Sequence, residues 1–256
     1  MVPAALAAVY VDGWVLAVWT TAAGLAMSRE WVRIVHRETL FDWHFALHAV
    51  ALAASQGLLA LGRQDWALAS ILAVAMVGNV AARARDERGI WVVVGIVFIA
   101  IPCFALVWLR EQPSFGFETA LWLLLVVWAT DSAAYLAGSV FGGPKLAPAI
   151  SPSKTWAGAV GGLAAGAAAT IGLAQVFGWV PTVAFLAAGF ALAFLTQCGD
   201  LAESFMKRTF GVKDASDLIP GHGGALDRLD GMIFATLGLA AYVAWAGHSP
   251  IAWTMP

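Results

Sequence analysis

Most side chains of this chain that could do chemistry lie in one short stretch. Residues 199–230 hold ten of the thirty Asp, Glu, Lys and Arg side chains in a chain of 256 residues. Carboxylates bind hard cations, while ammonium and guanidinium groups bind phosphate oxygens. The mixture therefore suits a metal-bound polyphosphate, and we expect the functional site of the protein here.

The first half of the stretch extends a predicted helix. If that helix continues, five polar side chains share one face: Asp200, Glu203, Ser204, Lys207 and Arg208. The apolar residues between them, such as Leu201 and Phe205, would then face the helix bundle, and the polar face would emerge at the membrane surface. The alternative is a solvated helix face whose charges pair only with one another.

The second half of the stretch is a turn followed by a helix. Residues 220–224 read PGHGG and precede ALDRLDGMIF, where the apolar pattern of the last helix begins. The N–H groups of such a turn and of the helix start favour an anion. Asp227 and Asp230 lie one turn apart on this helix, with Arg228 beside them. Carboxylates next to a glycine turn suit a hard cation that bridges phosphates.

Three weaker candidates precede this stretch. Lys145 and the run SPSKTW at residues 151–156 form a loop that suits a phosphate head group, although its lysines could simply set topology. Asp131 lies inside an apolar segment, where an ionisable group is a functional candidate. His44 and His48 are spaced to share a metal, but because no third ligand lies nearby in the sequence, packing is the favoured interpretation.

The composition indicates an integral membrane protein. Apolar residues make up 61% of the chain and charged residues only 12%, compared with about 25% charged in soluble proteins. The net charge of −2 gives no reason to expect a nucleic-acid partner. Cys103 and Cys198 lie in apolar segments and are expected to pack there. The first apolar run carries Asp12 and lacks a preceding Lys or Arg, so we expect a membrane helix rather than a signal peptide.

A membrane-spanning helix needs about 20 mostly apolar residues. By this rule the sequence predicts an all-α polytopic membrane protein, a bundle of about eight transmembrane helices with seven or nine as alternatives. The predicted spans are Ala4–Met27, Trp43–Leu61, Trp66–Ala82, Ile90–Leu109, Phe117–Phe141, Trp156–Phe177, Val180–Cys198 and Gly231–Gly247. We expect one membrane domain, in which residues 1–130 form N-terminal helices and residues 131–256 carry two polar loops, 145–156 and 199–230.

The distribution of Lys and Arg predicts the orientation. Short cytoplasmic loops collect these residues. With the N-terminus outside, twelve of the fourteen fall on the cytoplasmic side, and only Arg63 and Arg110 fall outside. Both termini are therefore expected outside, and both polar loops are expected to face the cytoplasm. Arg29, Arg33 and Arg37 form a basic stripe that suits orientation or anionic lipid.

Small residues recur four apart in the sixth predicted span. Gly158, Gly162 and Gly166 would let helices approach closely. Packing inside the bundle is the favoured interpretation, and a dimer interface is the alternative.

The polar positions between Ser204 and Asp230 also form a recognisable signature. The run S-F-M-K-R, four residues, K-D, three residues and L-I-P-G-H-G-G-A-L-D-R-L-D closely resembles that of the phosphatidate cytidylyltransferases, also called CDP-diacylglycerol synthases. Gly199-Asp200 and the run KLAPAISPSKTW at residues 145–156 resemble other polar motifs of this family. The resemblance covers the chain from about Asp131 onward, and the N-terminal half agrees only in its hydrophobicity.

The resemblance implies a nucleotidyltransferase of phospholipid biosynthesis. Such an enzyme transfers a cytidylyl group from CTP to phosphatidic acid, which gives CDP-diacylglycerol and pyrophosphate. The resemblance also implies Mg²⁺ and a second cation, K⁺, at aspartates that match Asp200 and Asp227. The expected partners are CTP, phosphatidic acid and membrane lipids, and a homodimer is a further expectation. The length and simple organisation of the chain suggest a bacterial inner membrane.

The resemblance, together with the spacing, assigns roles to individual residues. Asp200 and Asp227 are expected to hold the cations, with Asp230 and Asp131 as lesser candidates. The expected catalytic groups that bind or orient phosphates are Lys207, Arg208, Lys213, Arg228 and His222. The expected substrate-binding residues are Ser151, Lys154, Thr155, Lys145, Ser204, Asp214, Gly223 and Gly224.

The sequence departs from the family pattern at three positions. Ala157 stands where a glutamate is usual, Ala225 where a larger aliphatic residue is usual, and Gly231 where serine is common. The lost glutamate leaves open a related CTP-dependent transferase that acts on another lipid phosphate. A transporter or scaffold is the alternative from another class, but it would show internal repeats and charges along a path.

Overall fold

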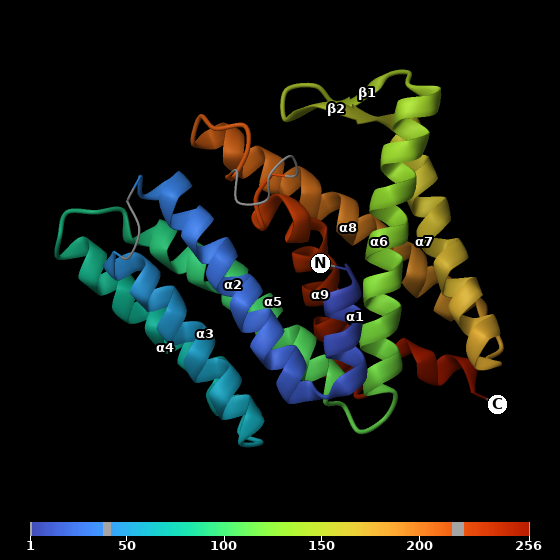
Figure 1. The fold of residues 1–256 in the computed structure, drawn as a ribbon, viewed down its shortest axis with the longest axis horizontal. Helices are drawn as coiled ribbons and strands as arrows, with labels where there is room; N and C mark the ends of the chain where they lie inside the picture. The colour runs from blue at the N-terminus through green and yellow to red at the C-terminus, as the bar shows by residue number, and fades with distance from the viewer. Residues whose placement is uncertain (1, 38–41, 217–222, 256) are drawn as a thin grey trace. The chain divides into compact units, whose positions relative to one another are not determined.

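A computed structural model describes residues 2–37, 42–216 and 223–255 of the chain (Figure 1). Those residues form nine α-helices, one short 3-10 helix and a two-stranded sheet. The elements are α1 Val2–Val11, α2 Gly13–Val35, α3 Trp43–Ala60, α4 Gln64–Arg83, α5 Gly89–Arg110, α6 Gly116–Phe141, β1 Lys145–Ala147, β2 Ser151–Thr155, α7 Trp156–Phe177, α8 Val183–Thr209, α9 Leu226–Ala246 and η1 Pro250–Thr254.

The prediction of an all-α polytopic membrane protein is confirmed. Within the described ranges, six helices, α4 to α9, are long and apolar enough to cross a membrane. Helix α2 includes only residues 13–27 of the first predicted span, α3 matches the second, and neither is among these six apolar helices. Charged side chains in α2, such as Glu30 and Arg33, account for its lower hydropathy. Membrane crossing by these two helices stays a prediction.

The first predicted span, Ala4–Met27, is wrong as a single helix. The chain breaks at Asp12, whose backbone is extended and whose Oδ1 accepts a hydrogen bond from the N–H of Gly13 at 2.6 Å. A carboxylate at this position satisfies one of the N–H groups that a helix start leaves without a partner. Asp12 therefore ends α1 and begins α2.

Contacts within the chain define two compact units. The first consists of residues 1–111 and 210–228, and the second of residues 112–209 and 229–256. Helix α9 begins in the first unit and continues in the second. The predicted division into residues 1–130 and 131–256 was drawn from where the polar motifs lie in the sequence. That division stays a prediction.

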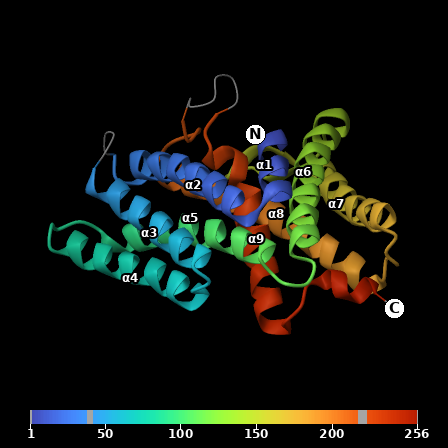
Figure 2. The ribbon, with the colours of Figure 1, turned by 60° about the horizontal axis from the view of Figure 1, so that its bottom comes forward.

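The first unit packs α2 to α5 against one another. Figures 1 and 2 both show α3 and α4 side by side, and α5 also contacts α2, α3 and α4. Trp31 of α2 is fully buried, and it lies so close to Gly95 of α5 that any side chain at that position would collide with the indole. Large aliphatic side chains fill the rest of the core, among them Leu16, Ile71 and Ile96.

The second unit is built around the close packing of α6, α7 and α8. A Cβ at Gly158 would lie 2.6 Å from the carbonyl oxygen of Ala134 on α6, and one at Gly162 would lie 3.0 Å from that of Thr130. Gly166 faces both α6 and α8. The interpretation of these glycines as contacts inside the bundle is confirmed. Their use in a dimer stays a prediction.

The loop between α6 and α7 forms a hairpin that the sequence analysis did not predict. Strands β1 and β2 pair antiparallel, with Lys145 opposite Thr155 and Ala147 opposite Ser151. Thr155 then begins α7, because its Oγ1 accepts a hydrogen bond from the N–H of Gly158 at 3.1 Å. The hairpin fixes the polar residues of this loop at the ends of α6, α7 and α8.

Candidate active site

An ion pair between Lys154 and Asp200 forms the centre of the polar cluster in the second unit. Lys154 Nζ on β2 lies 2.8 Å from Asp200 Oδ2 on α8. The two side chains are 26% and 21% exposed, so a substrate can reach them. They line a pocket of about 410 Å³ whose walls come from α6, the hairpin, α7 and α8. The structure thus brings together one residue from each of the two predicted polar loops.

Asp131 of α6 lines the same pocket. Its Oδ1 is buried and has no hydrogen-bond partner among the residues that the structure describes. Burying a carboxylate oxygen without a donor or a cation costs free energy. Asp131 therefore fits a place at which a cation or a substrate group supplies the missing partner.

Helices α8 and α9 cross at two glycines next to the candidate aspartates. A Cβ at Gly199 would collide with the backbone of Asp230, and a Cβ at Gly231 would lie 2.9 Å from Asp200 Oδ1. This close approach brings Asp230 within electrostatic range of the carboxylates of Asp200, Glu203 and Asp131. Three of the four predicted metal aspartates, Asp131, Asp200 and Asp230, thus lie together in the second unit.

Gly231→Ala is expected to lower the stability of the protein by about 1–3 kcal/mol, since a methyl group here overpacks the crossing. The new Cβ would lie 2.7 Å from Thr196 Cγ2 and next to Asp200. Thermal unfolding in detergent measures the effect. Gly172→Ala is the matched control, because Gly172 of α7 has nothing within 4 Å of its Cβ position and alanine favours a helix. Equal melting temperatures for the two variants would show that the crossing does not need a glycine.

Helix α8 continues to Thr209, as predicted, but the predicted orientation of its last turns is wrong. Glu203 and Lys207 are buried, and their side chains pair at 2.7 Å, whereas Phe205 is 58% exposed. The prediction treated the outside of the bundle as water. In a membrane protein an apolar side chain can face lipid, so the polar face is free to turn into the protein.

The start of α9 is held by two carboxylates of the first unit. Glu30 of α2 accepts hydrogen bonds from the N–H groups of Ala225 at 2.9 Å and Leu226 at 2.8 Å, and also from the hydroxyl of Ser216. Asp227 Oδ2 accepts from the N–H groups of Ala215 at 3.1 Å and Gly224 at 2.8 Å. Among the described residues of the predicted anion-binding turn and helix start, the N–H groups of Gly224, Ala225 and Leu226 thus donate to carboxylates of the protein itself.

Glu30, which is 2% exposed, was not among the predicted site residues. It lies within the basic stripe of Arg29, Arg33 and Arg37, which was predicted to set orientation or contact anionic lipid. An acid in a mostly apolar helix was the available signal. Arg33 also differs from expectation, because its guanidinium donates to the carbonyl oxygen of Ala215 at 3.0 Å. The end of α2 therefore binds residues 215, 216, 225 and 226.

The other predicted site residues lie in the hairpin, near the end of α8 and near the start of α9. Thr155 is buried as the N-cap of α7, and Ser151 Oγ lies 3.5 Å from Ser153 Oγ. Arg208 Nε donates to the carbonyl oxygen of Ile150 at 3.3 Å. Ser204 and Gly223 are half-buried and Gly224 is buried, whereas the exposed members of the set are Lys145, Arg208, Lys213, Asp214 and Arg228. His222 lies outside the described residues.

The residues of the second unit fit a hard metal cation. Asp131, Asp200 and Asp230 supply oxygen atoms, which Mg²⁺ and similar ions prefer. The buried oxygen of Asp131 lacks a partner among the described residues, and Lys154 offsets only part of the negative charge. Asp227, the remaining aspartate of the predicted set, belongs to the first unit.

The fold and the site together define a polytopic membrane protein with a carboxylate and lysine site suited to phosphate chemistry. Comparison with known proteins identifies the group to which it belongs. The model of the cytidylyltransferase family matches residues 1–246. The chain is 39% identical over 236 residues to the phosphatidate cytidylyltransferase of Brucella suis, covering 88% of this chain and 83% of the relative. It is 34% identical over 235 residues to that of Pseudomonas aeruginosa, covering 90% and 84%. The chain belongs to the cytidylyltransferase family.

Proposed function

We propose that this protein is a phosphatidate cytidylyltransferase, which forms CDP-diacylglycerol and pyrophosphate from CTP and phosphatidic acid. Family membership supports the activity, and so do the phosphatidate cytidylyltransferases that match over most of both chains. The observation that supports the location of the site is the Lys154–Asp200 pair, in a pocket that is also lined by Asp131, whose buried Oδ1 has no hydrogen-bond partner among the described residues.

The chemistry needs positioning and charge neutralisation more than a base. A phosphate oxygen of phosphatidic acid attacks the α-phosphorus of CTP, and the bond from that phosphorus to the pyrophosphate oxygen breaks. The attacking phosphate is already ionised near neutral pH, so no strong general base is required. Lys154, Lys207 and Arg208 would hold phosphate oxygens in line, and their positive charge would stabilise the charge that develops on the leaving pyrophosphate.

The metal assignment is part of the proposal. Asp200 and Asp227 would hold Mg²⁺ and a second cation, K⁺, with Asp230 and Asp131 as further oxygen ligands. Bound cations would neutralise the triphosphate and make its α-phosphorus more open to attack. His222 and Ser204 would orient phosphate oxygens, and the hairpin residues Ser151 and Thr155 would line the substrate path.

The relatives and the charge distribution support a membrane and an orientation for the protein. The protein is an integral membrane protein with several spans, and its matched relatives are bacterial. The bacterial relatives support a bacterial inner membrane, and the concentration of Lys and Arg in alternate loops supports a site that faces the cytoplasm and termini outside. A homodimer stays a prediction.

A radiolabelled-CTP assay on the purified protein in mixed micelles tests the function. With phosphatidic acid and Mg²⁺ we expect labelled CDP-diacylglycerol and release of one pyrophosphate per product. Parallel reactions omit the lipid or replace phosphatidic acid with a polyprenyl phosphate. Product from the polyprenyl lipid alone would identify a related transferase with another acceptor. If the protein neither binds CTP nor forms product from any lipid, the result would support a transporter or scaffold instead.

A further inference from the structure

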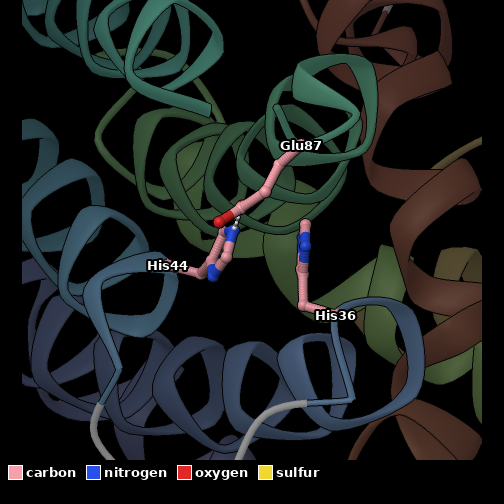
Figure 3. Close-up of side chains that lie close together, drawn as sticks. All are labelled: His36, His44 and Glu87. Atoms are coloured by element: carbon pink, nitrogen blue, oxygen red, sulfur yellow. Dashed lines mark hydrogen bonds and ion pairs between the residues drawn. The ribbon is translucent and has the colours of Figure 1, made fainter. Parts of the chain in front are cut away.

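A second group of metal-ligand side chains lies in the first unit, away from the residues assigned above. His36 follows the end of α2, His44 lies in the first turn of α3, and Glu87 lies in the connection from α4 to α5 (Figure 3). One ligand atom from each lies within 4.8 Å of the others. We propose that these three side chains bind a transition-metal ion, with Zn²⁺ as the best match.

The surroundings of His44 are those of a metal-binding histidine. Its Nδ1 lies 2.6 Å from Asp42 Oδ2 and its Nε2 lies 2.8 Å from Glu87 Oε2. An ionised carboxylate only accepts, so each contact calls for an N–H or a metal ion on that side of the ring. Metal-bound histidines usually donate their other N–H to a carboxylate, which fixes the ring. Asp42 fills that role, and a metal ion between Nε2 and Glu87 would complete the arrangement.

His36 supplies a second ring nitrogen to the group. Its Nε2 is buried and has no hydrogen-bond partner among the residues that the structure describes. Its ring stacks on that of His44, with 3.8 Å between the centroids, and Figure 3 shows it beside the His44–Glu87 pair. Metal ions bind imidazole in its neutral form, through a ring nitrogen that carries no proton.

His48, which the sequence paired with His44, takes no part. Its Nδ1 donates to the backbone carbonyl oxygen of His44 at 2.9 Å, so the two imidazoles do not face one another as paired ligands. The third ligand that the sequence lacked comes from Glu87, which lies 43 residues from His44. Only the packing of α3 with α4 and α5 brings it near.

The donor set selects the class of metal. Two imidazoles and one carboxylate with an open fourth position are typical of Zn²⁺, whereas Mg²⁺ prefers oxygen ligands alone. A tetrahedral zinc site needs ligand atoms about 3.3 Å apart, given bonds of about 2.0–2.1 Å. In the structure His44 Nε2 and Glu87 Oε2 are 2.8 Å apart and the rings of His36 and His44 are stacked, so metal binding would require these side chains to rotate. The ion would join the end of α2, the start of α3 and the α4–α5 connection, so its expected effect is on stability.

Cobalt substitution tests the proposal on the full chain. The protein is purified in detergent without a histidine tag, stripped with a chelator, kept in excess Mg²⁺ and titrated with Co²⁺. We expect one equivalent to bind with the visible absorption of a tetrahedral cobalt site, Zn²⁺ to displace it, and the melting temperature to rise. His36→Gln and Glu87→Gln should each weaken binding at least tenfold, and Asp42→Asn should weaken it by roughly 10–100-fold.

His248→Gln is the matched control, because His248 is exposed, belongs to the second unit and should not affect binding. Two results would overturn the proposal: no saturable Co²⁺ binding by the native protein, or unchanged binding in both His36→Gln and Glu87→Gln. If those variants do not fold, X-ray absorption of the native zinc-loaded protein decides. Scattering from two imidazoles supports the site, and a shell without imidazole excludes it. The result does not depend on the cytidylyltransferase activity.

Discussion

Asp200→Asn protein is expected to form CDP-diacylglycerol roughly 10²–10³ times more slowly than the native protein, the range seen when one preorganised electrostatic group is removed from an active site. The substitution keeps the size of the side chain but removes its negative charge. The charge is paired with Lys154 at 2.8 Å, and the amide would leave that ammonium group without its counter-ion. Both cation binding and the position of Lys154 should therefore suffer. The measurement is kcat with saturating CTP, phosphatidic acid and Mg²⁺.

Three comparisons make this result specific. Asp65→Asn makes the same chemical change at an exposed position in the first turn of α4 and should keep turnover within about twofold, as expected for a surface substitution. Asp227→Asn tests the second proposed cation ligand and should cause a loss similar to that of Asp200→Asn. Lys154→Met should raise KM for the phosphate substrates as well. Native turnover in folded Asp200→Asn and Asp227→Asn proteins would eliminate the metal assignment.

Local patterns in the sequence predicted the helices, because a helix is fixed by the period of its own apolar residues. They also predicted that α8 continues through Asp200 to the end of the polar stripe, and that the glycines of α7 pack inside the bundle. Two local signals were misread. Asp12 was treated as part of a span although aspartate is a good N-cap residue. The outer face of α8 was treated as solvent-facing and polar, although the apolar Phe205 is exposed there.

Contacts between distant segments could not be predicted in this way. Glu30 binds N–H groups 195 and 196 residues further along the chain, and no periodicity links the two positions. His36 and Glu87 were missed for the same reason, since His44 had only His48 at helical spacing. The Lys154–Asp200 pair was within reach, because two polar loops at the same membrane face have few other partners for their charges.

Glu30→Gln is expected to lower the stability of the protein and to cut kcat at least tenfold. The buried carboxylate accepts from Ala225, Leu226 and Ser216, and each hydrogen bond to a charged group contributes about 1.5–3 kcal/mol. A glutamine would turn an NH₂ group toward one of these donors and leave that donor unsatisfied. Asp227 follows Leu226 in the first turn of α9, so loss of these hydrogen bonds should displace it and impair the reaction without removing any group that touches substrate.

The kinetics distinguish this positioning role from a structural one. A purely structural defect lowers kcat only in proportion to the fraction of protein that is unfolded. Lipid or ligand that restores folding should then also restore kcat. A positioning defect lowers kcat in fully folded protein, measured below the melting temperature, and speeds amide exchange at residues 223–226. Ser216→Ala removes one donor of the three and should have a smaller effect in the same direction, while Glu118→Gln on α6 is the matched control. Native kcat in folded Glu30→Gln protein would show that the α9 start is held without this carboxylate.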